Sequence, residues 1–372
     1  MREYLLCLLT AAAVTYLTTP LARRLAIKAG AMAEVRDRDV HDEPTPRWGG
    51  LAMFMGLLAG LVLASQLPLM SAVFETNRQP LALLTGSSII VVLGLIDDRW
   101  GLDAPTKFLG QVIAAGSMAM LGIQMLWLPL FGTFVLDPLA SVLLTVLVVV
   151  LTINAVNFVD GLDGLAAGIV GIAAVALFTY SYALSVGFQI ERATLATLIC
   201  ALLAGMCAGF LPHNLNPARI FMGDTGSMLI GLMLAASMIT LTGQVDPSTL
   251  KGPLGIPTIL PILLPVAVIS LPLLDVALAV VRRTRQRRSP FAPDKQHLHH
   301  RLIEMGHSQR RAVTLMYAWT ALLAFTAVSF AFVQPLIIPL AIFVIGTAVL
   351  VFLVLRPPRI TTPGVPHDVP AA

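Results

Sequence analysis

The sequence predicts an all-α, polytopic integral membrane protein, because it is apolar, sparsely charged and built from long apolar stretches. Its 372 residues are 57% hydrophobic and only 12% charged, which is about half the charged fraction of a soluble domain. Apolar stretches of about 18 or more residues recur along the chain, and a stretch of that length crosses a bilayer as a helix. The alternating strand-like segments of membrane barrels are absent from the sequence.

Length and hydropathy predict about eleven transmembrane spans. In chain order they lie near residues 3–23, 49–70, 81–97, 107–123, 139–157, 164–186, 194–212, 225–243, 257–281, 312–333 and 336–355. The sequence leaves open whether the segment 107–123 crosses the bilayer fully. It also leaves open whether the segment 124–138 dips back into the membrane.

The basic residues predict how these spans are oriented, because cytoplasmic loops collect Lys and Arg. With a periplasmic N-terminus, the chain's 24 Lys and Arg all fall on the cytoplasmic side except Arg2, Arg78, Arg192 and Lys251. This skew predicts that the C-terminus is cytoplasmic. The net charge of +4 then reflects topology, and we expect membrane lipid and no nucleic acid as a partner.

We therefore expect a single transmembrane domain over residues 1–355 that carries all the chemistry. Its predicted cytoplasmic loops lie at about 24–48, 98–106, 158–163, 213–224 and 282–311. The proline-rich tail 356–372 is expected to be a disordered cytoplasmic segment.

Polar residues gather in four stretches that are far apart in the sequence but share the predicted cytoplasmic face. Aspartate in or beside a span is costly and points to function. The stretches are GLIDDRWGL with Asp97 and Asp98, NFVDGLDGLAAG with Asn157, Asp160 and Asp163, FMGDTGSMLIG with Asp224, and SPFAPDKQHLHHRL with His297, His299 and His300.

Each acidic residue also has a structural interpretation. Asp163 and Asp224 could each cap a helix, since Asp is a favoured N-cap residue. The Asp97–Asp98 pair could form an interfacial ion pair with Arg99. Asp275, inside the ninth predicted span, could pair with basic residues one or two turns further on. Capping alone does not require carboxylates on so many different segments, so we favour a functional site.

The residue types in these stretches favour magnesium and phosphate chemistry. Carboxylates with an Asn and no nearby thiolate suit a hard cation, and Mg²⁺ prefers one or two carboxylates plus substrate phosphates. We expect Mn²⁺ as a substitute. The Arg and His side chains of the loop 282–311 supply donors for phosphate oxygens. The sequence therefore predicts metal-assisted phosphoryl or diphosphate chemistry at the cytoplasmic membrane surface.

These four ordered motifs, with TPRWGG at 45–50, resemble the polyprenyl-phosphate N-acetylhexosamine-1-phosphate transferase family over nearly the whole chain. The histidine segment is most similar to the WecA branch, which uses UDP-N-acetylglucosamine (UDP-GlcNAc). The resemblance implies transfer of GlcNAc-1-phosphate to undecaprenyl phosphate, with release of UMP. It also implies a location in the bacterial inner membrane and a first step in O-antigen, common-antigen or cell-wall glycopolymer synthesis, and allows a homodimer.

The resemblance also implies roles for individual residues. Asp224 would be the Mg²⁺ ligand, with Asn157 as a second ligand and Asp98 as a further one. Asp97, Asp98, Asp160 and Asp163 match the family's catalytic or orienting acids. The residues implied in binding the diphosphate and nucleotide are Lys107, Arg283, His297, His299, His300 and Arg301.

Three alternatives stay open at this point. The same chemistry could use another UDP-N-acetylhexosamine or UDP-MurNAc-pentapeptide. A secondary transporter also has many spans with intramembrane acids, but it predicts internal repeats and charges near the bilayer midplane. The sequence has no such repeat, and its acids crowd one face. A lipid-binding scaffold without catalysis is the third alternative.

Overall fold

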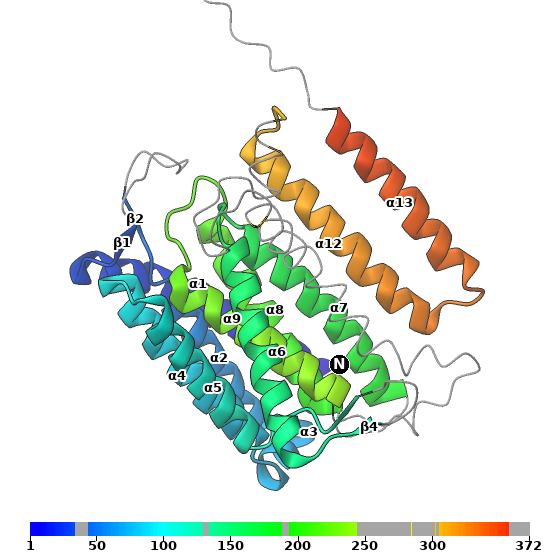
Figure 1. The fold of residues 1–372 in the computed structure, drawn as a ribbon, viewed down its shortest axis with the longest axis horizontal. Coiled ribbons are helices and arrows are strands. Elements are labelled where there is room, and N and C mark those ends of the chain that lie inside the picture. The colour runs from blue at the N-terminus through cyan, green and yellow to red at the C-terminus, as the bar shows by residue number, and fades with distance from the viewer. Residues whose placement is uncertain are drawn as a thin grey trace, which may run out of the picture.

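The computed structural model describes residues 1–33, 44–128, 134–187, 193–243 and 305–356, together with Thr284 and Leu302. Figure 1 shows long helices lying side by side, with α12 and α13 at one edge of the bundle. The helices are α1 Arg2–Ala29, α2 Gly49–Gln66, α3 Pro68–Thr76, α4 Gln79–Trp100, α5 Ala104–Met120, α6 Pro138–Val159, α7 Leu165–Gly187, α8 Ala193–Asn214, α9 Gly223–Gly243, α12 Gln309–Phe332 and α13 Ile337–Leu355.

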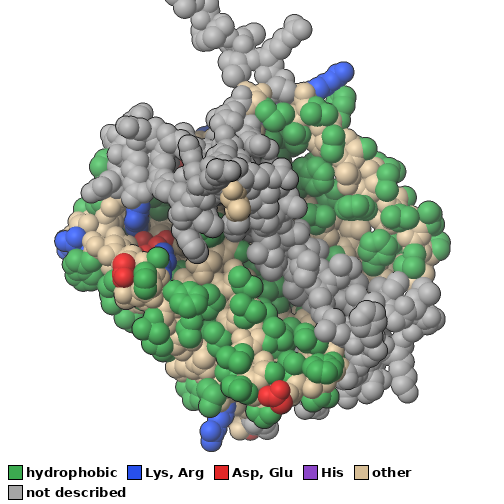
Figure 2. Space-filling view, in the orientation of Figure 1, with side chains coloured by type: hydrophobic (Ala, Val, Ile, Leu, Met, Phe, Trp, Pro, Cys, Tyr) green, Lys and Arg blue, Asp and Glu red, His purple; other side chains and the backbone are tan. Residues whose placement is uncertain are grey.

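The all-α membrane fold predicted from the sequence is confirmed. Within the described residues, nine helices are long and apolar enough to cross a membrane, and each coincides with a predicted span. Figure 2 shows that the flanks of the molecule are mostly hydrophobic, while charged side chains lie near the ends of the helices. A bilayer requires this distribution, because charges in its hydrocarbon core are costly.

Two of the eleven predicted spans are not among these nine helices. Helix α5 covers most of the segment 107–123, but its 17 residues reach only about 25 Å at 1.5 Å per residue. The predicted span 257–281 lies outside the described residues. The count of eleven and the orientation of the termini therefore stay predictions.

Local sequence explains where several helices begin and end. A proline stands in the first turn of α4, α5 and α6, where the missing N–H has no helical partner to lose. Asp137 caps α6, because its side chain accepts hydrogen bonds from the backbone N–H groups of Leu139 and Ala140 at 3.0 and 3.1 Å. Helix α1 ends at Gly30, whose φ of 71° suits glycine at a helix C-terminus.

Helix α9 is the centre of the bundle. It packs against α2, α4, α6, α7 and α8. All residues of its most apolar stretch are buried, whereas only 11% of the residues are buried in the corresponding stretch of the peripheral α13. A helix that is apolar all round is stable when neighbouring helices surround it. The first residues of α9 are consequently held in place by several other elements at once.

Glycines allow the neighbours of α9 to approach its first turn closely. A Cβ atom at Gly94 of α4 would overlap the backbone of Thr225, and one at Gly50 of α2 would overlap the backbone of Gly226. Small residues at such crossings let helix backbones come together in membrane proteins. The sequence FMGDTG is thus clamped between α2 and α4.

A short backbone strap adds to this clamp. Strands β1 (Met32–Ala33) and β2 (Thr45–Pro46) pair antiparallel. Phe221 donates its N–H to the Pro46 carbonyl at 2.8 Å, and Gly49 and Gly50 donate to the carbonyls of Phe221 and Met222, each at 3.0 Å. A second small hairpin, β3 (Trp127–Leu128) with β4 (Phe134–Val135), lies within the segment 124–138.

We expect Gly94→Ala to destabilise the protein, because the new methyl group would push α4 away from Thr225. Overpacking of this kind costs about 1–3 kcal/mol. Gly116→Ala is the matched control, since a Cβ there meets nothing within 4 Å, and it should leave the helix unchanged or stabilise it by up to ~1 kcal/mol. Thermal unfolding in detergent measures both. Equal melting temperatures for the two variants would contradict the clamp.

Candidate functional site

The ends of four helices bring together five polar residues that the sequence analysis singled out. Asp97 and Asp98 end α4, Lys107 lies in the first turn of α5, Asn157 is near the end of α6, and Asp224 begins α9. Ion pairs and hydrogen bonds link all five into one group, which Asp98 joins through the backbone N–H of Asp224. We call this group the acidic cluster. The convergence predicted from the four motifs is therefore present for the three motifs that the structure describes.

Lys107 joins two of the carboxylates. Its Nζ lies 2.9 Å from Oδ2 of Asp97 and also contacts Oδ2 of Asp224. The other oxygen of Asp97 accepts the N–H of Leu102 at 2.7 Å, which holds the turn after α4. One ammonium group thus compensates two carboxylates at the rim of the bundle, where isolated charges would be costly.

Asp98 is tied to the first turn of α9. Its Oδ1 accepts the N–H of Asp224 at 2.9 Å, and its Oδ2 accepts the N–H and the hydroxyl of Thr225 at 3.1 and 2.6 Å. The side chain is only 6% exposed. These bonds satisfy N–H groups that have no partner inside the helix, and the negative charge lies at the positive end of its dipole.

Asn157 orients Asp224 from the side of α6. Its Nδ2 donates to Oδ1 of Asp224 and to the hydroxyl of Ser227, both at 2.8 Å. With Lys107 on Oδ2, both oxygens of Asp224 are positioned by neighbouring helices. The carboxylate is therefore held in one orientation by α5 and α6 while its backbone is held by α4.

Asp160 follows α6 directly and is partly exposed. Desolvation and, after it, the nearby carboxylates of Asp224 and Asp98 together raise the pKa of Asp160 to about 8, while Arg47 acts in the opposite direction. A carboxylate ringed by like charges favours its neutral form unless a cation arrives. Arg47 of TPRWGG is a residue that the sequence analysis did not assign to the site, although its motif was recognised.

Asp163 braces the loop that precedes α9 and is buried. Its Oδ2 accepts the N–H of Ala218 at 3.1 Å and Nδ2 of Asn216 at 3.0 Å. Both partners belong to the loop 215–222, which leads directly into Gly223 and Asp224. Asp163 therefore contacts the loop that leads into the site and does not itself contact the side chains of the acidic cluster in the hydrogen bonds described.

The remaining predicted site residues cannot be placed. Arg283, His297, His299, His300 and Arg301 lie outside the described residues, as does Asp275. Their implied contacts with the donor's phosphates stay predictions.

The acidic cluster offers a hard cation a few oxygen ligands rather than a complete set of protein ligands. Asp224, Asp97 and Asn157 present oxygen ligands, which Mg²⁺ prefers, and Asn157 would use its Oδ1. Within the part of the chain that the structure describes, no three Asp, Glu, His or Cys side chains form a metal-binding group. A Mg²⁺ ion bound here would have to take its other ligands from water and substrate phosphates.

The role of Asp98 as a further metal ligand stays a prediction. Both of its oxygens accept hydrogen bonds from the first turn of α9, just as both oxygens of Asp97 and of Asp224 contact neighbouring groups. A cation bound by any of these carboxylates would replace some of these contacts. The sequence could indicate only that a second acid follows Asp97. Which of two adjacent acids faces the site depends on the rotation of α4 against α9.

Comparison with known proteins agrees with these motifs. The model of glycosyl transferase family 4 matches residues 80–242, a range that holds the whole acidic cluster. A decaprenyl-phosphate N-acetylglucosaminephosphotransferase from Mycolicibacterium smegmatis is 47% identical, over 90% of this chain and 84% of that protein.

Two further relatives act on related substrates according to their names. An undecaprenyl-phosphate alpha-N-acetylglucosaminyl 1-phosphate transferase from Yersinia pestis is 30% identical, over 82% of this chain and 79% of that protein. A phospho-N-acetylmuramoyl-pentapeptide-transferase from Rubrobacter xylanophilus is 34% identical, over 77% of this chain and 82% of that protein.

We expect Asp98→Ala to lower the melting temperature more than Asp137→Ala. Both residues cap a helix, but Asp98 is buried and accepts three hydrogen bonds, whereas Asp137 is exposed and accepts two. Leaving buried donors unpaired costs about 1–3 kcal/mol, while losing an exposed cap costs about 1 kcal/mol. Thermal unfolding in detergent compares them. A larger loss for Asp137→Ala would show that Asp98 does not hold α9.

We expect Asp160 to make stability fall as pH rises in metal-free buffer. Its folded pKa of about 8 lies above the ordinary 3.8, so the folded state keeps a proton that the unfolded chain loses between these values. Asp160→Asn removes this titration. The variant should therefore melt above the wild type at about pH 8.5, and this difference should shrink toward about pH 5. A difference that does not change with pH would contradict the raised pKa.

Proposed function

The chain belongs to glycosyl transferase family 4, and from this premise we propose that it transfers GlcNAc-1-phosphate from UDP-GlcNAc to a polyprenyl phosphate. The products are a polyprenyl-diphosphate-linked GlcNAc and UMP. Relatives named for decaprenyl and for undecaprenyl phosphate both match the chain, so the proposal covers both acceptors. Membership of a transferase family argues against the secondary-transporter alternative.

The observation that carries the proposal is the acidic cluster at the ends of apolar helices. A polyprenyl phosphate stays in the membrane, and a nucleotide sugar stays in water. The two reactants can meet only at the interface. Asp97, Lys107 and Asp224 are joined there by contacts between α4, α5 and α9, at the rim that the basic residues predict to be cytoplasmic.

The acceptor phosphate needs positioning more than it needs a base. A phosphate monoester has a second pKa of about 6 and is mostly a dianion at neutral pH. Phosphoryl transfer is achieved chiefly by placing the reactants in line and compensating their charge. We therefore propose a direct displacement, in which an oxygen of the acceptor phosphate attacks the phosphorus next to the sugar and UMP leaves.

The residues of this chain divide the work of the proposed reaction. Lys107 offers its ammonium group to phosphate oxygens, and Asp224 with Asn157 and Asp97 would hold Mg²⁺. The cation would supply charge neutralisation between the two anionic substrates. Asp98 and Asp163 act on the backbone around Asp224 and position it. The donor's phosphates would meet the Arg and His residues of the loop 282–311.

The donor specificity is the finer part of the proposal. The histidine segment resembles that of the UDP-GlcNAc branch, and two relatives are named for N-acetylglucosamine. One relative is named for a pentapeptide donor, so UDP-MurNAc-pentapeptide is the alternative that a donor panel has to test. We propose UDP-GlcNAc as the preferred donor.

Release of UMP by the purified full-length protein tests the proposed reaction. We expect release from UDP-GlcNAc only when a polyprenyl phosphate and Mg²⁺ are both present, and much less from UDP-GalNAc or UDP-MurNAc-pentapeptide. Decaprenyl and undecaprenyl phosphate are compared as acceptors, and Mn²⁺ replaces Mg²⁺ in a parallel series. Folded protein that released no UMP from any donor would disprove the function, whereas release only from UDP-MurNAc-pentapeptide would disprove the proposed donor.

The pH dependence of Asp98→Asn tests how Asp98 acts. We expect a large loss of UMP release that is equal at about pH 6.5 and about pH 8.5, because the acceptor phosphate is already a dianion over most of this range. The wild type at both pH values is the control. Recovery of the variant's rate at the higher pH would indicate that Asp98 accepts a proton, and the positioning role would be wrong.

A further inference from the structure

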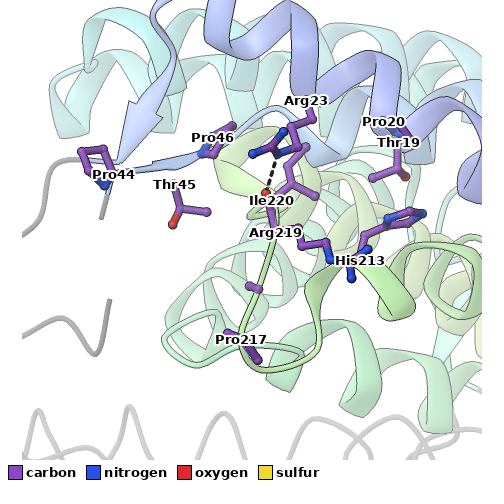
Figure 3. A pocket seen from close by; sticks show the side chains of 11 residues that line it. Thr19, Pro20, Arg23, Pro44, Thr45, Pro46, His213, Pro217, Arg219 and Ile220 are labelled. Carbon is purple, nitrogen blue, oxygen red and sulfur yellow. Dashed lines mark hydrogen bonds between the residues drawn. The ribbon is translucent and has the colours of Figure 1, made fainter. Parts of the chain in front are cut away.

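A hollow lies between α1 and the loop 215–222. It has a volume of about 780 Å³ and is lined by the last turns of α1, by strand β2, by the end of α8 and by that loop. Figure 3 shows Arg23, Arg219 and His213 around it. None of the residues of the acidic cluster lines it, so we treat it as a separate site and call it the Arg23 pocket.

The ionisable groups among the described lining residues of the Arg23 pocket are basic, and the hydroxyls of Thr19 and Thr45 line it as well. Arg23 comes from α1, His213 from α8 and Arg219 from the loop, and none of the described lining residues is Asp or Glu. Within the described ranges the ion pairs are those that Lys107 makes, so neither arginine has a carboxylate partner there. A cavity whose described lining carries two guanidinium groups and no acid favours an anionic ligand, and arginine matches phosphate oxygens in particular.

The structure positions these basic groups. Arg23 donates its Nε–H to the carbonyl oxygen of Arg219 at 3.0 Å (Figure 3), which uses one of the five N–H donors of its guanidinium. The His213 ring packs on the Tyr16 ring with centroids 4.7 Å apart, and its Nε2 lies 3.1 Å from the Tyr16 carbonyl oxygen. Contacts of α1 with α8 and with the loop 215–222 therefore fix the positions of both side chains.

An exposed apolar stripe on α1 leads from the membrane span to this pocket. Leu9, Ala13, Tyr16 and Pro20 are all exposed and recur at the spacing of one helix face. The next residue of the same face is Arg23. A ligand seated here would therefore have a phosphate beside the arginines and an apolar part along the stripe.

We propose that the Arg23 pocket binds the phosphate headgroup of an anionic phospholipid, whose acyl chains lie along the Leu9–Pro20 stripe. A soluble phosphate would use the basic groups but not the stripe, and this is the reason for assigning a lipid. Anionic lipids are also enriched in the membrane leaflet at whose surface basic residues collect.

A lipid bound in this pocket would stabilise the loop 215–222, which precedes Asp224. The loop 215–222 is attached to α1 through Arg23, to α12 through the bond from Arg310 to the Asn216 carbonyl at 2.9 Å, and to Asp163 through Ala218. A phosphate between Arg23 and Arg219 would add a further attachment. The binding itself does not depend on which sugar the protein transfers, so it can be tested without the reaction.

Thermal unfolding of the full-length protein in detergent tests the proposal, with phosphatidylglycerol or phosphatidylcholine titrated into the micelles. We expect phosphatidylglycerol to raise the melting temperature by several degrees and phosphatidylcholine to have little effect. Arg23→Gln combined with Arg219→Gln should abolish the difference between the lipids. Arg219→Gln alone keeps the Arg23 bond to the backbone. It should raise the phosphatidylglycerol concentration needed for the half-maximal shift at least tenfold.

Arg24→Gln combined with Lys28→Gln is the matched control. Both residues are exposed at the same end of α1 and neither lines the pocket, so this variant has the same charge loss and should keep the response to phosphatidylglycerol. An equal loss in the control would reduce the effect to general surface charge and overturn the proposal. Inorganic phosphate or glycerol 3-phosphate producing the same shift would assign a soluble ligand and overturn the lipid.

Discussion

The contact between Asp98 and the first turn of α9 is the interaction on which the site depends. A carboxylate that is nearly inaccessible to solvent must have its charge compensated, and three hydrogen bonds from Asp224 and Thr225 provide this. Gly223 permits it, since a Cβ atom at that position would overlap the Asp98 carboxylate. The same contact fixes the backbone of Asp224. The side chain of Asp224 can then be oriented by Asn157 and Lys107.

The acidic cluster is short of positive charge among the described residues. Lys107 serves both Asp97 and Asp224, and Asp160 lies near the carboxylates of Asp224, Asp98 and Asp163, whose effect Arg47 partly offsets. Such an arrangement is unfavourable for the protein alone and becomes favourable when a cation binds. We interpret this imbalance as the physical reason why a divalent ion and a phosphate-bearing substrate would bind together at this rim.

The loop 215–222 links the acidic cluster with the rest of the membrane domain. Asp163, Arg23 and Arg310 contact it from three different elements, and the strap after β2 holds its last residues. A short segment held from so many sides has little freedom to move. Asp224 is therefore presented by a rigid frame, which is what phosphoryl transfer requires when positioning supplies most of the catalysis.

Length and hydropathy predicted the helices, because a bilayer demands long apolar stretches. The polar motifs predicted that Asp97, Asp98, Asn157 and Asp224 meet, because acids at the ends of such stretches are costly and point to function. Lys107 was implied only by the resemblance to the family. The motifs could not separate the roles of Asp97 and Asp98, because adjacent residues on a helix point about 100° apart and only the packing of α4 on α9 selects the one that faces α5. They also could not find Arg47 or the Arg23 pocket. Both depend on contacts between segments that are far apart in the chain, such as the bond from Arg23 of α1 to the Arg219 carbonyl oxygen.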